Sequence, residues 1–358
     1  MDNLAKVLTQ DIESSTHSAN STMSALALAS AGDSFKLAQV TLPTPQLAAG
    51  QVLIKVEYAG LNPVDTKLAK VGHQSWQYPH VPALDGVGIV VESEQKHCPL
   101  LGKRVLWHSD LTKQGALAQY IAMDAHALAI VPEQIPPADA VTIPCAGMTA
   151  MLALCKLSLE AGQTILIEAG AGAVGQFAIQ LAKAKGLTVL ATASKRNHKL
   201  LKGLGADDVF DYREPDLPER INKALGYQPL DAVLDSVGGE STARNISLLK
   251  FNGKIACLNP LPIIDQGLLF AKAPAINMIS LGGAWLANDL CAQQKLSMMA
   301  NHLLELIADK ALRTPEVTLM PFNPKCLTAA MHNQLKSGLL GKQVARVSSG
   351  YGHEKRVS

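Results

Sequence analysis

A glycine-rich turn between an apolar strand and an apolar helix constrains the fold more than any other feature of this chain. Residues 164–168 form an apolar run, Gly170-x-Gly172-x-x-Gly175 follows at once, and residues 174–185 have the apolar spacing of a helix. We expect the first glycine to permit a tight turn, the second to let backbone amides approach a diphosphate, and the third to let the helix pack closely on the strand. The alternative is a contact between helix and strand that binds no ligand. The predicted diphosphate contacts are Gly170, Gly172, Ala173, Val174 and Gly175.

The second predicted strand, residues 188–193, ends without the acid that NAD-specific sites usually carry. Such sites place Asp or Glu about 20 residues after the glycines, where it accepts hydrogen bonds from the adenosine ribose. Here Ser194 is followed by Lys195 and Arg196, which can donate charge-assisted hydrogen bonds to a 2′-phosphate. We therefore predict NADPH as the cofactor. The alternative is that the two cations only solvate the start of a helix.

The order of the predicted elements indicates an α/β protein with two domains. At 358 residues the chain is too long for one compact core. Strand-like runs dominate up to about residue 144, and strand and helix then alternate, which predicts a doubly wound parallel sheet. Residues 1–22 are rich in Ser, Thr and Asn, and we expect them to form a disordered extension.

The composition excludes several classes of protein. With 48% hydrophobic and 17% charged residues, the chain can form real cores and is not disordered as a whole. A net charge of +2 gives no electrostatic footprint for nucleic acid or a membrane surface, so we expect neither as a partner. The six cysteines contain no CxxC pair, which is typical of reduced thiols and a cytoplasmic protein. We expect no segment that spans a membrane, because we find no apolar stretch of the ~18 residues needed to cross a bilayer.

Five further motifs occur in a fixed order along the chain, at residues 57–66, 82–90, 102–105, 144–150 and 235–239. Together with the glycine-rich turn they resemble the medium-chain dehydrogenase/reductase superfamily and, within it, the zinc-free quinone oxidoreductase-like branch. The resemblance covers residues 23–347.

This resemblance implies a domain organisation and an assembly. Residues 23–144 and 290–358 would form a GroES-like catalytic domain, and residues 145–289 a Rossmann domain that binds NADP(H). The active site would lie in the cleft between them. The apolar run at 276–285 resembles the edge segment through which relatives form homodimers.

The metal ligands of zinc-dependent relatives are absent. Those relatives use Cys, His and Cys at positions that look like Asn62, Leu84 and Cys145 here. One thiolate cannot hold tetrahedral zinc, which needs at least three protein ligands, and Asp85 could add only one oxygen. The four-Cys structural lobe is also missing, since residues 91–102 contain a single cysteine. We therefore predict no metal and interpret Cys145 as a small buried apolar residue.

Without a Lewis acid, hydride transfer needs an acceptor that is already electrophilic. The predicted substrate is a small electrophilic molecule, a quinone or an activated carbonyl or alkene. The predicted donor to the developing oxyanion is Asn62, which replaces the metal ligand; its alternative is to cap the loop before Pro63. Asp65 is expected to hold the same loop through backbone amides.

Other site residues follow from the resemblance, and each has an alternative. Tyr58 lines the pocket or packs between the domains, and Thr149 contacts the nicotinamide or caps a helix. Lys67 stands where relatives often have Tyr; it stabilises an enolate or is a solvated surface residue. The remaining predicted cofactor contacts are Tyr212, Asn259 and, as a phosphate ligand, Lys342.

The sequence thus predicts a zinc-independent, NADPH-dependent oxidoreductase that transfers hydride to quinones or other activated carbonyl or alkene acceptors. One alternative is an alkenal/enone double-bond reductase. The other is a non-catalytic NADPH-binding protein with a regulatory or structural role.

Overall fold

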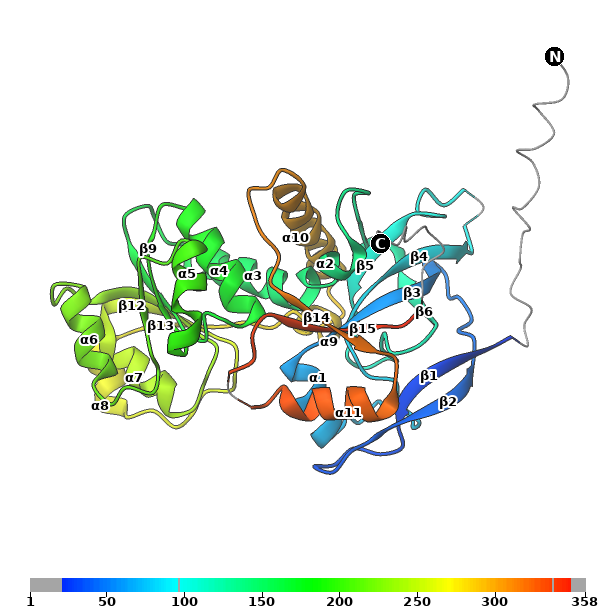
Figure 1. Cartoon of the computed structure of the whole chain (residues 1–358), viewed down its shortest axis with the longest axis horizontal. Helices are drawn as coiled ribbons and strands as arrows, with labels where there is room; N and C mark the ends of the chain where they lie inside the picture. The colour runs from blue at the N-terminus through cyan, green and yellow to red at the C-terminus, as the bar shows by residue number, and fades with distance from the viewer. Residues whose placement is uncertain (1–20, 96, 337, 349–358) are drawn as a thin grey trace, which may run out of the picture.

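The chain folds into two domains that lie side by side, a β-domain and a nucleotide-binding domain (Figure 1). The computed structural model describes residues 21–95, 97–336 and 338–348. The predicted extension, residues 1–22, lies outside the described residues except for its last two positions. Thr22 already belongs to the first strand, so the predicted boundary is wrong by one residue.

The β-domain contains a seven-stranded sheet in the order β14-β15-β3-β4-β5-β7, with β6 paired to β3, and a separate antiparallel pair, β1 and β2. Its strands are β1 Thr22–Leu28, β2 Leu37–Pro43, β3 Gln51–Leu61, β4 Asp85–Ser93, β5 Arg104–His108, β6 Tyr120–Asp124, β7 Ala129–Ile130, β14 Val317–Pro321 and β15 Lys342–Arg346. Its helical segments are α1 Pro63–Val71, η1 Ala125–Ala127, α2 Pro137–Ala140 and α11 Pro324–Asn333.

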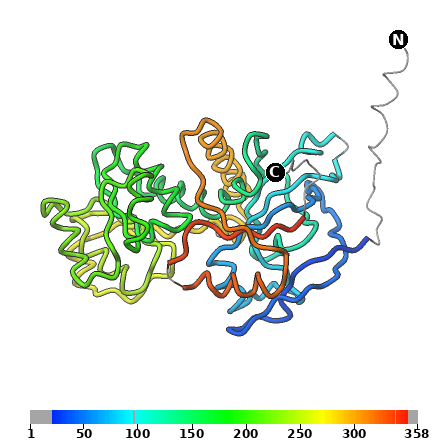
Figure 2. Tube along the Cα trace, in the orientation of Figure 1, coloured from blue at the N-terminus to red at the C-terminus, as the bar shows by residue number. Residues whose placement is uncertain are grey.

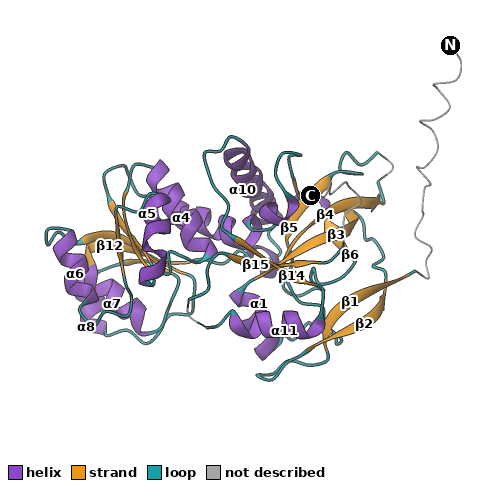
Figure 3. Cartoon of the chain, viewed as in Figure 1, coloured by secondary structure: helices purple, strands orange, loops and turns teal. Residues whose placement is uncertain are grey.

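The nucleotide-binding domain contains a six-stranded parallel sheet in the order β10-β9-β8-β11-β12-β13. Its strands are β8 Thr164–Ile167, β9 Thr188–Thr192, β10 Asp208–Phe210, β11 Leu230–Asp235, β12 Leu249–Cys257 and β13 Ala275–Met278. Helices cover both faces of this sheet (Figure 3). The helical segments are η2 Ile143–Gly147, α3 Met148–Leu157, α4 Ala173–Ala184, η3 Lys195–Asn197, α5 His198–Gly203, α6 Leu217–Ala224, α7 Glu240–Leu248, α8 Gln266–Lys272, α9 Gly283–Leu286 and α10 Leu290–Ala308.

The strand order confirms the predicted doubly wound sheet. The order runs outward from β8 to β10 on one side and from β11 to β13 on the other, so it reverses between β8 and β11. Ligands of such sheets bind beyond the carboxyl ends of the strands at this reversal. The short β8 is apolar and almost fully buried, as expected for a central parallel strand that is covered on both faces.

The last described strand, β15, belongs to the β-domain. β15 pairs antiparallel with β3 and parallel with β14. On the way, Gly341 N donates to Ala171 O beside the glycine-rich turn, so the C-terminal trace runs along the junction of the two domains (Figure 2). Helix α10 also lies at this junction, since it contacts η1 and β7 of one domain and α3 of the other. The exact domain boundaries stay predictions.

One apolar core joins the two domains. Its members include Leu106 of β5, Ile165 of β8, Leu303 of α10 and Val344 of β15, each at most 1% exposed. A second core fills the β-domain, and a third lies under the other face of the parallel sheet. The shared core fixes the orientation of the two domains, and therefore the shape of the cleft between them.

One buried segment corrects an expectation from the sequence. Residues Pro137–Leu157 form a helical stretch that is long and apolar enough to cross a membrane, which the sequence reading did not recognise. This stretch is 72% buried inside the protein. Its apolar side chains therefore contact the shared core.

Candidate functional site

A cavity of about 770 Å³ lies between the glycine-rich turn and the β-domain. Ligand-binding clefts have this size. Its wall combines residues from α1, from the carboxyl ends of β8, β9, β11 and β12, and from the segment before β15. The cavity therefore opens at the edge of the parallel sheet where a dinucleotide is expected.

The glycine-rich turn forms one end of the cavity. Gly172 is the N-cap of α4, and Ala173, Val174 and Gly175 of the first turn also line the wall. The amide end of this helix, with its positive dipole, is thus available to an anionic group. Gly170, which was also predicted to contact the cofactor, does not line the cavity, and its contact with the cofactor stays a prediction.

Each glycine of the motif is needed for a different reason. A Cβ at Gly175 would lie 2.6 Å from Gly170 Cα, which confirms that the third glycine allows close packing. A Cβ at Gly170 would lie 2.8 Å from Leu201 Cδ1, and the left-handed turn residue is Ala169 with φ 51°, so the turn does not depend on Gly170 as expected. At Gly172 the nearest atom would be 3.4 Å away, so the protein itself leaves room there.

The adenosine end of the cavity differs from the prediction. Ser194 and Tyr212 line the wall as expected, and so does Asn197, which was not among the predicted cofactor contacts. Lys195 and Arg196 are exposed and do not line it. Arg196 Nη2 instead donates to Gly338 O at 2.9 Å, and Gly338 itself lines the cavity. Their role as direct 2′-phosphate ligands therefore stays a prediction.

Two predicted residues meet across the cavity. Lys67 Nζ of α1 donates to Asn259 Oδ1 at 2.5 Å, and Asn259 Nδ2 donates to Ser236 O at 2.9 Å. Both residues line the wall. Partial burial lowers the pKa of Lys67. Lys67 is thus an exposed residue, as its alternative expected, but it also connects the β-domain to the end of β12.

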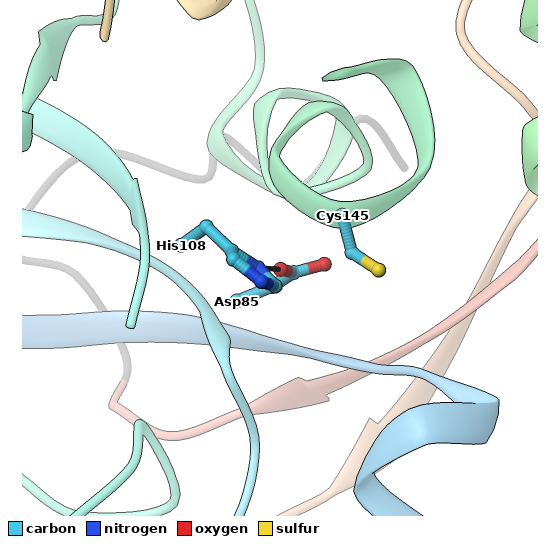
Figure 4. A group of neighbouring side chains, drawn as sticks. All are labelled: Asp85, His108 and Cys145. Atoms are coloured by element: carbon cyan, nitrogen blue, oxygen red, sulfur yellow. Dashed lines mark hydrogen bonds and ion pairs between the residues drawn. The ribbon is translucent and has the colours of Figure 1, made fainter. Parts of the chain in front are cut away.

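The acceptor end of the cavity contains a buried polar cluster of Asn62, Asp85, His108 and Lys342. Asn62 Nδ2 donates to Asp85 Oδ2 at 2.9 Å, and Lys342 Nζ donates to Asp85 Oδ2 at 2.8 Å and also to Asn62 Oδ1. His108 Nδ1 lies 2.9 Å from Asp85 Oδ1 (Figure 4). Asn62, His108 and Lys342 line the cavity, whereas Asp85 does not.

The charges of this cluster stabilise one another. Burial by itself would raise the pKa of Asp85, but Lys342 and His108 outweigh it and hold that pKa below its usual value. Burial likewise opposes the charged form of Lys342, but the charge of Asp85 raises the pKa of Lys342 above its usual value. Asp85 and Lys342 therefore form a fully charged, buried ion pair.

Asp65 and Asn62 hold the loop before α1 at this end of the cavity. Asp65 accepts from the backbone N–H of Asn62 at 2.7 Å and of Leu84 at 3.0 Å, which confirms its structural role. Burial, and then the charge of Asp85, raises the pKa of Asp65 to about 7. Asn62 is the N-cap residue of α1, as its alternative expected, and it also lines the cavity; its role as a donor to the oxyanion stays a prediction.

The other assignments here need correction. Tyr58 does not line the cavity; it packs against the shared core, so its catalytic assignment is wrong. Thr149 lines the cavity from the first turn of α3, whose N-cap is Gly147, so the capping alternative is wrong. Lys342 binds Asp85 and Asn62, not the adenosine end of the site, so its assignment as a phosphate ligand is wrong. Cys145 is half-buried and lines the cavity, so it is not simply a core residue.

The acceptor end also contains three groups that could approach a metal ion. Ligand atoms of Asp85, His108 and Cys145 lie within 4.8 Å of one another (Figure 4). However, both oxygens of Asp85 are already bound, and one of them pairs with the ammonium of Lys342. Burial raises the pKa of the Cys145 thiol, which opposes the thiolate that a metal needs. A fixed ammonium beside these donors repels a divalent cation, so this set does not fit a metal.

A second buried cluster was not predicted. Glu168 follows β8 directly and lines the cavity; its Oε1 accepts from Arg244 Nη2 at 2.6 Å and from Ser241 Oγ at 3.2 Å. Burial, and then the nearby Asp235, raises the pKa of Glu168 to about 7. A carboxylate between an apolar strand and a glycine-rich turn was the signal that could have identified it.

Known proteins resemble this chain in both of its domains. Residues 48–133 match the family model described as alcohol dehydrogenase GroES-like domain, and residues 173–294 match the model described as zinc-binding dehydrogenase. These matches agree with the two domains of the structure.

Individual relatives add detail. The chain is 34% identical over 235 residues to a chloroplast envelope quinone oxidoreductase homolog of Arabidopsis thaliana, covering 63% of this chain and 70% of that protein. It is 35% identical over 207 residues to the trans-enoyl reductase himH of Aspergillus japonicus, covering 54% of this chain but only 60% of that relative. A mycobacterial protein solved with NADPH superposes with a TM-score of 0.78 at 26% identity, covering 90% of this chain and 99% of the other.

Proposed function

Because the chain belongs to the quinone oxidoreductase-like branch of the medium-chain dehydrogenase/reductase superfamily, we propose that it is a zinc-independent, NADPH-dependent reductase of quinones or other activated carbonyl or alkene acceptors. The observation that carries the proposal is a single cavity with a diphosphate cradle at one end and a buried polar cluster at the other. Such a cavity can hold a nicotinamide and an acceptor in contact with each other.

The glycine-rich end fits the cofactor. The open space above Gly172 lets backbone amides approach a diphosphate, and the amide end of α4 favours its negative charge. When bound, the cofactor supplies a hydride to the acceptor. Ser194 and Tyr212 line the adenosine end of the cavity. Position 194 holds Ser instead of the acid of NAD-specific sites, which supports NADPH over NADH. The mycobacterial structure with NADPH supports the same choice.

The other end suits an electrophilic acceptor. Leu84, Leu111 and Leu281 make much of that wall apolar, which excludes water from the reacting atoms. Asn62 donates one side-chain N–H to Asp85, and its second N–H is available to an acceptor oxygen. Solvent supplies the proton that completes the reduction. The ammonium beside Asp85 supports the proposed independence from zinc.

Two relatives of different specificity leave the choice of acceptor to experiment. The Arabidopsis relative is named for quinones and the Aspergillus relative for an enoyl group. The second candidate is therefore an alkenal/enone double-bond reductase with the same residues. Both acceptors accumulate negative charge on oxygen when carbon receives hydride, so one site can serve either.

We further propose a homodimer formed through β13. This strand ends the described parallel sheet, and its Met278 side chain is 42% exposed. An exposed strand edge can pair with the same edge of a second copy. Sedimentation equilibrium that gives the mass of one chain would contradict this assembly. The cytoplasmic location stays a prediction, since the Arabidopsis relative is named for the chloroplast envelope.

The proposed activity is tested by initial rates of NADPH oxidation with 1,4-benzoquinone and with a simple enone, after dialysis against EDTA and with NADH in parallel. We expect rapid turnover that prefers NADPH and does not increase when zinc is returned. Activity that appears only with zinc contradicts the proposed mechanism. Tight NADPH binding without turnover of either acceptor supports the non-catalytic alternative.

A further inference from the structure

The acceptor end of the cavity contains a buried lysine that the reaction so far does not use. The side chain of Lys342 is only 3% exposed, although it lines the cavity. Its stem passes over Gly60, where an added Cβ would lie 3.0 Å from Lys342 Cε. A buried ammonium is costly unless it is paired, so the fold tolerates this one only through specific partners.

Those partners orient the charge toward the cavity. Lys342 Nζ donates to Asp85 Oδ2 and to Asn62 Oδ1. Asp85 does not line the cavity, so the negative member of the pair lies behind the positive one. An ammonium has three N–H groups. Two of them are bound within the described residues, which leaves one for a ligand.

The ammonium of Lys342 lies beside the three groups that could approach a metal ion. Lys342 donates a hydrogen bond to the carboxylate of Asp85. Ligand atoms of Asp85, His108 and Cys145 lie within 4.8 Å of one another. The ammonium therefore lies where a metal ion held by those groups would have to compete with it. A reductase without a metal still needs positive charge near the acceptor oxygen.

We propose that Lys342 is a catalytic residue whose ammonium donates a hydrogen bond to the acceptor oxygen and stabilises the negative charge that develops there during hydride transfer. This inference rests on the proposed reductase function. Asn62 contributes its free N–H to the same oxygen, so the two side chains form an oxyanion site.

Reduction of an enone consists of hydride transfer to carbon followed by protonation. The β-carbon accepts a hydride, two electrons and one hydrogen nucleus, from NADPH, which leaves as NADP⁺. The carbon–carbon π pair moves to form the enolate, whose oxygen is bound by Lys342 and Asn62. A proton from solvent then adds to the α-carbon, and the saturated ketone leaves.

This arrangement predicts that acceptors depend on Lys342 to different degrees. An enolate concentrates charge on a basic oxygen and therefore gains much from the ammonium. The anion of a reduced quinone is delocalised and less basic, so it gains less. Removing the ammonium should therefore slow enone reduction more than quinone reduction.

The test compares Lys342→Met with the unaltered protein in single-turnover hydride transfer to a simple enone and to 1,4-benzoquinone. We expect the enone rate to fall about 100-fold or more, as when an oxyanion donor is removed, and the quinone rate to fall at least tenfold less. The dissociation constant of NADPH, measured by fluorescence, should change less than about threefold. The control is Lys325→Met, which removes an exposed lysine from α11 and should leave every rate unchanged.

A second variant separates catalysis from folding. Lys342→Met leaves Asp85 buried and unpaired, whereas Lys342→Met combined with Asp85→Asn removes both charges. We expect the double variant to regain thermal stability but not the enone rate. Recovery of that rate would show that Lys342 serves only as the counter-charge of Asp85.

An equilibrium measurement adds a readout that does not depend on turnover. 4-Nitrophenol bound beside NADP⁺ should ionise at a lower pH in the unaltered protein than in the double variant, followed by its absorbance. Equal ionisation in both, or equal loss of both acceptor rates in Lys342→Met, overturns the role of Lys342. If the unaltered protein binds NADPH but reduces neither acceptor, the proposed function itself fails, and the role of Lys342 fails with it.

Discussion

The two ends of the cavity differ in how far apart in the sequence their functional residues lie. At the nucleotide end, the cradle comes from one turn and one helix, residues 169–175. At the acceptor end, Asn62, Asp85, His108 and Lys342 come from four separate elements, and Lys342 and Asp85 are 257 residues apart. A local motif can therefore specify a binding cradle, whereas a buried ion pair depends on the assembled sheet.

The largest effect on stability is expected when the carboxylate of Asp85, which pairs with Lys342 at the acceptor end, is removed. Asp85→Ala leaves the ammonium of Lys342 buried without its counter-charge, and the free energy of unfolding should fall by about 3–5 kcal/mol. Urea denaturation measures it. Lys342→Met combined with Asp85→Asn should lose clearly less; equal losses would mean that the charges are not coupled.

At the nucleotide end, two glycines should respond in opposite ways. Gly175→Ala forces a Cβ to within 2.6 Å of Gly170 Cα and should reduce the free energy of unfolding by about 1–3 kcal/mol. Gly172→Ala meets no atom closer than 3.4 Å, so its stability should change by less than about 0.5 kcal/mol.

The same pair tests the ligand cradle. Gly172→Ala fills space that the diphosphate is expected to use, so NADPH should bind more weakly although the fold is intact. Thermal denaturation and fluorescence titration separate the two effects. Unchanged affinity for NADPH in Gly172→Ala would place the diphosphate elsewhere.

The cofactor choice can be reversed at one position. Ser194→Asp places a carboxylate where NAD-specific relatives carry their acid, and it should repel a 2′-phosphate. We expect NADPH affinity to fall about tenfold or more, with NADH affinity unchanged or higher. Arg196→Ala is the matched comparison and should have little effect, because Arg196 binds Gly338 O instead of lining the cavity. A larger loss of NADPH affinity in Arg196→Ala than in Ser194→Asp would show that Arg196 binds the 2′-phosphate directly.

The smallest effect concerns Glu168, in the wall between the two ends. Its pKa is raised from the ordinary 4.5 to about 7, so between these values the folded protein retains a proton that the unfolded chain has released. Stability from this group is therefore fully present below pH 4.5 and falls as pH rises toward 7, by at most about 1.4 kcal/mol per pH unit.

The check compares unaltered protein with Glu168→Gln, which does not titrate. The difference in their urea midpoints should shift against the unaltered protein between pH 5 and pH 7. Other groups, including Asp65, contribute to both proteins and cancel. A difference that is constant with pH would show that Glu168 keeps an ordinary pKa in the folded state.

The sequence was sufficient for the doubly wound parallel sheet, the α/β class and the position of the glycine-rich turn. These features depend on apolar periodicity and on glycines that are close in the chain, so local rules apply to them. It also indicated the structural role of Asp65, since that carboxylate acts on backbone amides of its own helix and of the nearby Leu84.

Only the tertiary structure decided which side chains face the cavity. The sequence shows Lys195 and Arg196 in a suitable place, but in the fold both are exposed and Arg196 binds Gly338 O at the cavity wall. It shows Lys342 as one more cation near a glycine, but the return of β15 to β3 buries it against Asp85. Pairing across a sheet brings distant segments together, and burial then forces their charges to pair. For that physical reason the cradle could be predicted from the sequence, whereas the acceptor end had to be seen in the fold.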